Sequence, residues 1–175
     1  CYNLGPIINT KYWESQPSIS ADGQLLFFSS NRYGGYGGSD IWMSRKKDSF
    51  WTEPVNLGPE INTKQDEYCP YLHYDNKTFY FASQGHPGFG GFDLYMTDID
   101  SIGEVGDIIN LGYPINTHYD ESGLIVSQDG KKAYYNSNKK GNLDIYTFDL
   151  PQKYIAQAIS IVNGLVTDSI SGAGV

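Results

Sequence analysis

Three glutamates recur at nearly constant spacing and are the first candidates for chemistry. Glu14, Glu67 and Glu121 lie 53 and 54 residues apart, and hard cations such as Ca²⁺ bind several carboxylate oxygens at once. If the three side chains met at the mouth of a channel, they could hold a cation. Each also follows an Asn-Thr pair at a fixed interval, so we favour a structural role in which the carboxylate caps that turn. No cofactor is expected.

Two glycine-rich segments could be mistaken for phosphate-binding loops. They span residues 34–40 and 88–93, and both end in aspartate. A phosphate-binding loop leads into the N-terminus of a helix, whereas the residues after both segments are typical of a β-strand. We therefore interpret the glycines as tight connections between strands, in which the aspartate accepts hydrogen bonds from loop amides.

No nucleophile with a base beside it can be identified. His73, His86 and His118 fall at different phases of the 53- to 54-residue spacing, and Gly-x-Ser-x-Gly, His-Glu-x-x-His and Cys-x-x-Cys motifs are absent. The two cysteines, Cys1 and Cys69, make neither a disulfide framework nor a metal site. We expect a protein that is not an enzyme.

The loops around the glycine-rich segments are unusually aromatic. Aromatic and arginine side chains dominate the energetics of many protein interfaces, although such residues also cover the edges of sheets. Both interpretations remain open at this point. The candidates for partner binding are Arg32, Tyr33, Tyr36, His86, Phe89 and Phe92.

A threefold internal repeat must position all of these residues. Asn-Leu-Gly begins at Asn3, Asn56 and Asn110, and a period of this size built from short strands is typical of the blades of a β-propeller. Other elements recur in register: Ile-Asn-Thr at 8, 61 and 115, Asp-Gly or Asp-Asn at 22, 75 and 129, aromatic pairs at 27, 80 and 134, and Asp-Ile-Trp or its variants at 40, 93 and 144.

Each repeat contains four short apolar segments, the strand count of a propeller blade. In the first repeat they cover residues 15–20, 24–29, 40–45 and 51–57, and Asp22-Gly23 supplies the turn of the first hairpin. The second segment is the most hydrophobic, as expected for a strand that is buried on both faces. Helical periodicity is absent, so the sequence predicts an all-β fold, a propeller fragment of about three four-stranded blades.

The repeat also predicts the domain organisation. Residues 1–13 are expected to be the outer strand and linker of a preceding blade, and residues 14–57, 58–111 and 112–160 to be three blades. Residues 161–175 are expected to begin a second β-domain. Because a closed ring usually has about four to eight blades, we expect a longer parent protein. Lipidation of Cys1 is an alternative, but it would leave half a blade at the anchor.

Charge limits the classes of partner. The chain has 12 basic and 20 acidic residues and a net charge of −8, so we expect neither nucleic-acid binding nor electrostatic docking to anionic lipid. No apolar run approaches the ~18 residues of a membrane span.

The residues of the first repeat resemble a known propeller family. Glu14, Pro17, Asp22-Gly23, Phe27-Phe28, Ser30-Asn31-Arg32, the glycines that follow and Asp40-Ile41-Trp42 resemble the TolB-like, WD-repeat-like repeat, and the match extends over all three units. Residues 162–175 are similar to the opening of a carboxypeptidase-regulatory-like β-sandwich. A propeller followed by such a domain resembles the PorE-type, OmpA-family proteins of Bacteroidetes. The third repeat departs from the pattern at Leu124, where the other two have proline.

This resemblance implies a function. It implies a periplasmic scaffold at the outer membrane, serving the type IX secretion system, with protein subunits of an envelope or secretion complex as partners. Peptidoglycan would be bound by an OmpA-like domain that these 175 residues do not include. Two alternatives remain, an accessory propeller of a prolyl-oligopeptidase-like peptidase and a module that binds glycans or peptidoglycan fragments. Since the repeated residues build the scaffold, we expect function to depend on the histidines and loop aromatics that the copies do not share.

Overall fold

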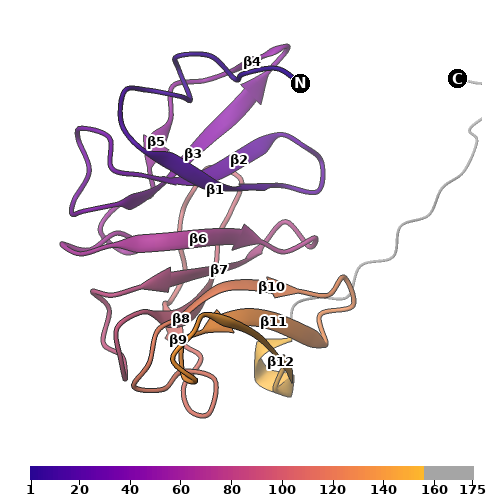
Figure 1. Cartoon of the computed structure of the whole chain (residues 1–175). Helices are drawn as coiled ribbons and strands as arrows, with labels where there is room; N and C mark the ends of the chain where they lie inside the picture. The colour runs from indigo at the N-terminus through magenta and orange to yellow at the C-terminus, as the bar shows by residue number, and fades with distance from the viewer. Residues whose placement is uncertain (156–175) are drawn as a thin grey trace, which may run out of the picture.

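The computed structural model describes residues 1–155, which form three antiparallel sheets (Figure 1). The expected second domain over residues 161–175 lies outside the described residues. In the first sheet, β1 (Glu14–Ile19), β2 (Leu25–Ser30) and β3 (Asp40–Lys47) follow one another, and β4 (Phe50–Trp51) and β5 (Val55–Asn56) both pair with β3. The single strand expected over residues 51–57 is therefore two strands. Pro54, which lacks a backbone N–H, lies between them.

The second sheet repeats this order with a single fourth strand, and the third sheet has only the first three strands within residues 1–155. The second contains β6 (Glu67–Leu72), β7 (Thr78–Ser83), β8 (Asp93–Asp98) and β9 (Ile109–Asn110). The third contains β10 (Glu121–Val126), β11 (Lys132–Ser137) and β12 (Asp144–Asp149), and is followed by the short 3₁₀ helix η1 (Gln152–Tyr154). The sheets stack in chain order (Figure 1), which is the arrangement of propeller blades. The predicted all-β propeller fragment is confirmed.

The hairpins that join the first two strands of each blade form as the Asp-Gly pattern predicts. Gly23, Asn76 and Gly130 have φ of 71°, 56° and 72°, in the left-handed region that glycine and asparagine tolerate best. In each turn the preceding aspartate accepts a hydrogen bond from the backbone two residues later, at 3.0 to 3.1 Å.

Two apolar cores hold the three blades together. Between the first two blades, the rings of Phe27 and Phe79 lie 5.0 Å apart. Between the second and third blades, Tyr80 and Leu94 pack with Tyr135. Every residue of β2 and β7 is buried, as expected for second strands covered on both faces. That expectation is wrong for β11, which alternates between exposed and buried residues, because no further sheet covers its outer face within residues 1–155.

The inner strands share a bulge. The pairing of β1, β6 and β10 with their neighbours shifts at Gln16, Cys69 and Gly123, which have φ of 54°, 53° and 63°. The Cys69 N–H donates to Gln16 Oε1 at 3.0 Å. The bulges thus link the first two inner strands, and all three strands line a groove of about 530 Å³.

Candidate functional site

The loops between β2 and β3 (residues 31–39) and between β7 and β8 (residues 84–92) lie on one face of the molecule, which we call the loop face. The loop between β2 and β3 packs on the segment before β6, because the Gly38 N–H donates to the Gln65 carbonyl at 2.9 Å and the Ser39 N–H donates to Asp66 Oδ1 at 2.7 Å. A β-carbon on Gly37 would collide with the Gln65 carbonyl oxygen. Glycine is therefore required for this close approach between blades.

Two buried aspartates fix the shape of these loops. Asp40 accepts hydrogen bonds from the Tyr36 N–H at 2.6 Å and the Gly37 N–H at 3.2 Å. In the second blade Asp93 accepts from the Phe89 N–H at 2.9 Å and the Gly90 N–H at 3.1 Å. The predicted role of the aspartates as acceptors for loop amides is thus confirmed. It places Tyr36 and Phe89 at equivalent positions of two rigid loops.

The aromatic candidates differ in exposure. Tyr33, Tyr36 and Phe89 are 90%, 51% and 57% exposed. Phe92 is half-buried, and its ring packs 5.1 Å from that of Tyr68. Tyr33, Tyr36 and Phe89 can therefore reach a partner directly, whereas Phe92 belongs to a row of packed aromatic rings.

Sequence reasoning missed the other members of that row. The ring of Tyr68 also lies 5.6 Å from that of Trp13, which is 43% exposed. A signal was present, because Trp13 occupies the repeat position at which the other blades have Asp66 and Asp120. Trp13, Tyr68 and Phe92 come from the first and second blades and form a continuous line of rings near the inner strands.

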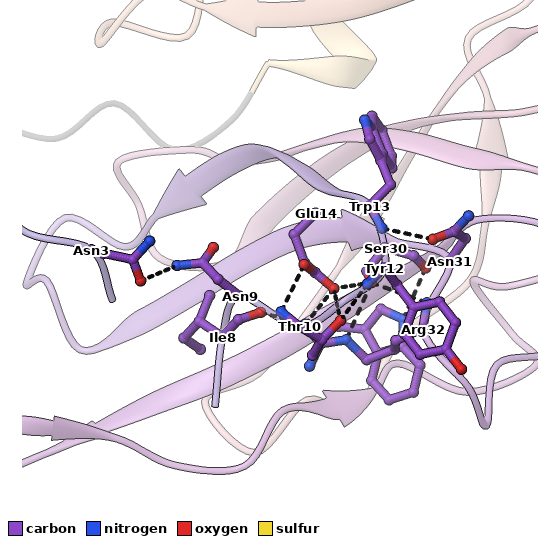
Figure 2. Close-up of polar contacts among 11 residues, drawn as sticks. Asn3, Ile8, Asn9, Thr10, Tyr12, Trp13, Glu14, Ser30, Asn31 and Arg32 are labelled. Carbon is purple, nitrogen blue, oxygen red and sulfur yellow. Dashed lines mark hydrogen bonds and ion pairs between the residues drawn. The ribbon is translucent and has the colours of Figure 1, made fainter. Parts of the chain in front are cut away.

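Arg32 lies beneath the surface. Its side chain is only 9% exposed, and its Nη2 donates to the Ile8 carbonyl at 2.7 Å and contacts Glu14 Oε1 at 3.3 Å (Figure 2). The guanidinium also stacks on Phe28 and Trp42, 4.8 and 5.4 Å from the ring centroids. Since these contacts occupy the guanidinium, we exclude Arg32 from the exposed binding surface.

His86 is half-buried. Like Arg32, it contacts a backbone carbonyl and two aromatic rings. Its Nε2 lies 2.9 Å from the Ile61 carbonyl oxygen. Its ring packs 5.8 Å from Phe81 and 5.2 Å from Tyr95. The residue is still partly exposed and lines a pocket.

The recurring glutamates are saturated with hydrogen bonds. Glu67 accepts from Thr63 N, Thr63 Oγ1 and Ser83 Oγ at 2.6 to 2.8 Å. Glu121 accepts the equivalent hydrogen bonds from Thr117 and Ser137 in the third blade. Glu14 accepts those of Thr10 and Ser30 in the first blade, and a further one from Arg32 (Figure 2). Within residues 1–155 no group of three His, Cys, Asp or Glu side chains is arranged as metal ligands. The three carboxylates tie each inner strand to the turn that precedes it.

A pocket on the loop face brings two of the candidates together. It has a volume of about 550 Å³, with Tyr36 on the side of the first blade and His86 on the side of the second. Its floor is the segment before β6. The lining residues are Tyr36, Pro59, Asn62, Thr63, Lys64, Gln65, Gly85 and His86.

The described part of the chain contains no helix with the length and apolar character needed to cross a membrane.

Comparisons with known proteins identify the architecture. Neither a protein-family model nor a curated protein sequence matches the chain. Among solved structures, TolB from Acinetobacter baumannii is similar with a TM-score of 0.55 and 19% identity, over 77% of this chain and 29% of that one. A putative TolB from Agrobacterium tumefaciens gives 0.51 and 25% over 77% and 42%, and an α-L-arabinofuranosidase from Lactobacillus brevis gives 0.53 and 19% over 86% and 52%.

These likenesses concern the fold and not the activity of those proteins. The chain spans only 29% and 42% of the length of the two TolB structures. The repeats, the stacked antiparallel sheets and these likenesses agree. The chain is a β-propeller module whose fold is similar to that of the TolB structures.

Proposed function

We propose that the chain is a non-enzymatic module that holds protein partners on its loop face. The observation that carries this proposal is the repeated presentation of Tyr36 and Phe89, each anchored through its backbone to a buried aspartate and each more than half exposed. Exposed aromatic side chains on a rigid scaffold lose little conformational entropy on binding and are enriched among interface hot spots.

The wider setting that we propose is a secretion complex of the bacterial envelope. The resemblance of the repeats and of residues 162–175 to PorE-type proteins supports a component of the type IX secretion system, located in the periplasm and associated with the outer membrane. In such a protein an OmpA-like domain outside these residues would contact peptidoglycan. The propeller would then contribute protein contacts.

The surroundings of the reactive side chains support a role without catalysis. Burial raises the pKa of the Cys69 thiol, which disfavours the nucleophilic thiolate. His73 is fully buried, and its Nε2 lies 3.1 Å from the Ser127 carbonyl oxygen. His86 is held by the Ile61 carbonyl. Each of these groups is engaged in packing or in a contact with the backbone.

Affinity capture tests this proposal. The protein is used as bait on solubilised envelopes of the cells that encode it, beside a Tyr36→Ala/Phe89→Ala variant. A Phe50→Ala variant is the control, because Phe50 is 74% exposed but lies past the opposite end of β3. We expect an envelope or secretion subunit to be captured by the unmodified protein and the control, and to be lost with the double variant. Capture that the double variant retains, or that retrieves no envelope component, would overturn the proposal.

A further inference from the structure

The pocket between Tyr36 and His86 is lined by a basic residue and by no acidic one, on a chain that is acidic as a whole. Lys64 lines it and is exposed, and Lys64 forms no ion pair within residues 1–155. None of the lining residues is Asp or Glu, although the chain carries a net charge of −8. An anionic group would therefore meet local attraction here and repulsion over much of the remaining surface.

Among the acidic residues nearest in sequence, Glu60 is exposed but does not line the pocket, and the other two accept hydrogen bonds. Asp66 Oδ1 accepts the Ser39 N–H at 2.7 Å. The Glu67 carboxylate is fully buried beneath the floor and accepts from Thr63 and Ser83. Burial also raises the pKa of Glu67, which favours its neutral form. Lys64 is exposed and lines the pocket, so its ammonium group can contact a ligand there.

The walls of the pocket are already in place. Asn62 is buried and joins the floor to the first blade, since its Oδ1 accepts the Ile41 N–H at 2.7 Å and its Nδ2 donates to the Ile41 carbonyl at 3.0 Å. The backbone of Tyr36 is held by Asp40 at 2.6 Å, and His86 by the Ile61 carbonyl at 2.9 Å. A preformed pocket binds without the cost of ordering its loops.

Apolar surface lies next to this cation. The ring of Tyr36 is half exposed and Pro59 is exposed, and both line the same pocket as Lys64. A ligand that combines an anionic group with an adjacent apolar group is therefore complementary to this lining. No carboxylate lines the pocket, so a sugar hydroxyl would lack the strong charge-assisted acceptor that a carboxylate provides.

We propose that this pocket binds an extended acidic peptide segment of a protein partner. An Asp or Glu carboxylate of the partner pairs with Lys64 beside His86, and a neighbouring apolar side chain packs on Tyr36 and Pro59. This inference rests on the proposed function and specifies the chemistry of the partner. Phe89, at the equivalent position of the next loop, extends the contact surface beyond the pocket.

Peptide display tests the inference directly. A phage library of random linear dodecapeptides is selected on the immobilised chain, and enriched peptides are synthesised with fluorescein and titrated by fluorescence anisotropy. We expect enriched peptides to place Asp or Glu beside Leu, Phe or Tyr, and Asp→Asn or Glu→Gln versions to bind at least tenfold more weakly. Lys64→Glu and Tyr36→Ala should each weaken binding at least tenfold, while Lys47→Glu, exposed at the far end of β3, should leave it within twofold.

Charge reversal makes the test specific to the pocket. Peptides with Lys in place of the acidic residue should bind the Lys64→Glu variant better than the unmodified chain. The inference is overturned if no peptide is enriched, if the enriched peptides lack acidic residues, or if Lys64→Glu binds them as well as the unmodified chain. Binding on a glycan array that needs Tyr36 but is insensitive to Lys64→Glu would assign the pocket to sugars instead.

A capture experiment separates this inference from the proposed function. Partner capture that survives Lys64→Glu but is lost with the Tyr36→Ala/Phe89→Ala variant would overturn this inference and leave the proposed function standing.

Discussion

Arg32 and His86 occupy the same place in successive blades. Arg32 Nη2 contacts the Ile8 carbonyl at 2.7 Å, and His86 Nε2 lies 2.9 Å from the carbonyl of Ile61, the equivalent residue of the next repeat. Both side chains pack against the equivalent aromatic pair, Phe28 and Trp42 in one blade and Phe81 and Tyr95 in the other. A nitrogen-bearing side chain at this place is therefore part of the scaffold.

The third blade has a related contact. Lys139 follows Ser137 by two residues, as Arg32 follows Ser30, and its Nζ lies 3.7 Å from the centroid of the Tyr146 ring. His86 therefore has a scaffold role through its buried contacts. Alignment by sequence pairs His86 with Tyr33, which conceals this equivalence.

Replacing Arg32 should test its structural role. Arg32→Ala removes a hydrogen bond from a charged group and a cation–π stack, worth together about 2–4 kcal/mol, so we expect the free energy of unfolding to fall by about that amount in urea denaturation. Arg32→His should lose less, because histidine fills the equivalent place in the second blade. Lys47→Ala, at an exposed site, should change the free energy by less than ~0.5 kcal/mol. Equal losses for Arg32→Ala and Lys47→Ala would contradict the assignment.

Glu67 and Glu14, which occupy equivalent positions, should change the free energy of unfolding with pH in opposite directions. Burial raises the pKa of Glu67 above its ordinary value of 4.5, and hydrogen bonds from Ser83 and Thr63 only partly oppose this. Its contribution to stability is present below pH 4.5 and lost as the pH rises through the folded-state pKa. For Glu14, burial is outweighed by hydrogen bonds from Thr10 and Ser30 and by the charge of Arg32, which lower its pKa. Its contribution is present above pH 4.5 and lost as the pH falls through the folded-state pKa.

Measuring the free energy of unfolding against pH for Glu67→Gln and Glu14→Gln checks this pair of signs. The unmodified chain should lose stability relative to Glu67→Gln as the pH rises from 4 to 7, and should gain it relative to Glu14→Gln over the same range. Parallel curves for the two variants would contradict the opposite pKa directions of the two carboxylates.

Much of the fold could be predicted because it depends on local residue types. Asp22-Gly23 and its counterparts specify hairpins, and the aromatic pairs that begin at Phe27 and Tyr80 recur in strands that are fully buried. The remaining features could not be predicted, because they depend on contacts between residues that are far apart in the sequence. The burial of Arg32 depends on Ile8 and Glu14, which are 24 and 18 residues away, and the Trp13–Tyr68 contact joins two blades. The pocket combines residues of two loops and of the segment between them, so no single motif predicts it.

Gly37 should be sensitive to substitution. A β-carbon there would collide with the Gln65 and Thr63 carbonyl oxygens of the next blade, so Gly37→Ala should reduce the free energy of unfolding by about 1–3 kcal/mol. Gly106→Ala is a matched control, because a β-carbon at Gly106 would meet its neighbours only at 3.6 Å or more. A melting temperature of Gly37→Ala equal to that of the control would show that the two blades do not approach so closely.

Site-specific photocrosslinking tests the central claim most directly. A benzoylphenylalanine residue is placed at Tyr36, at Phe89 or, as the control, at Phe50, and envelopes are irradiated in intact cells. We predict discrete adducts with an envelope protein from positions 36 and 89 and none from position 50. Adducts from position 50 alone, or their absence at both loop positions, would contradict the claim that the aromatic loop face binds the partner.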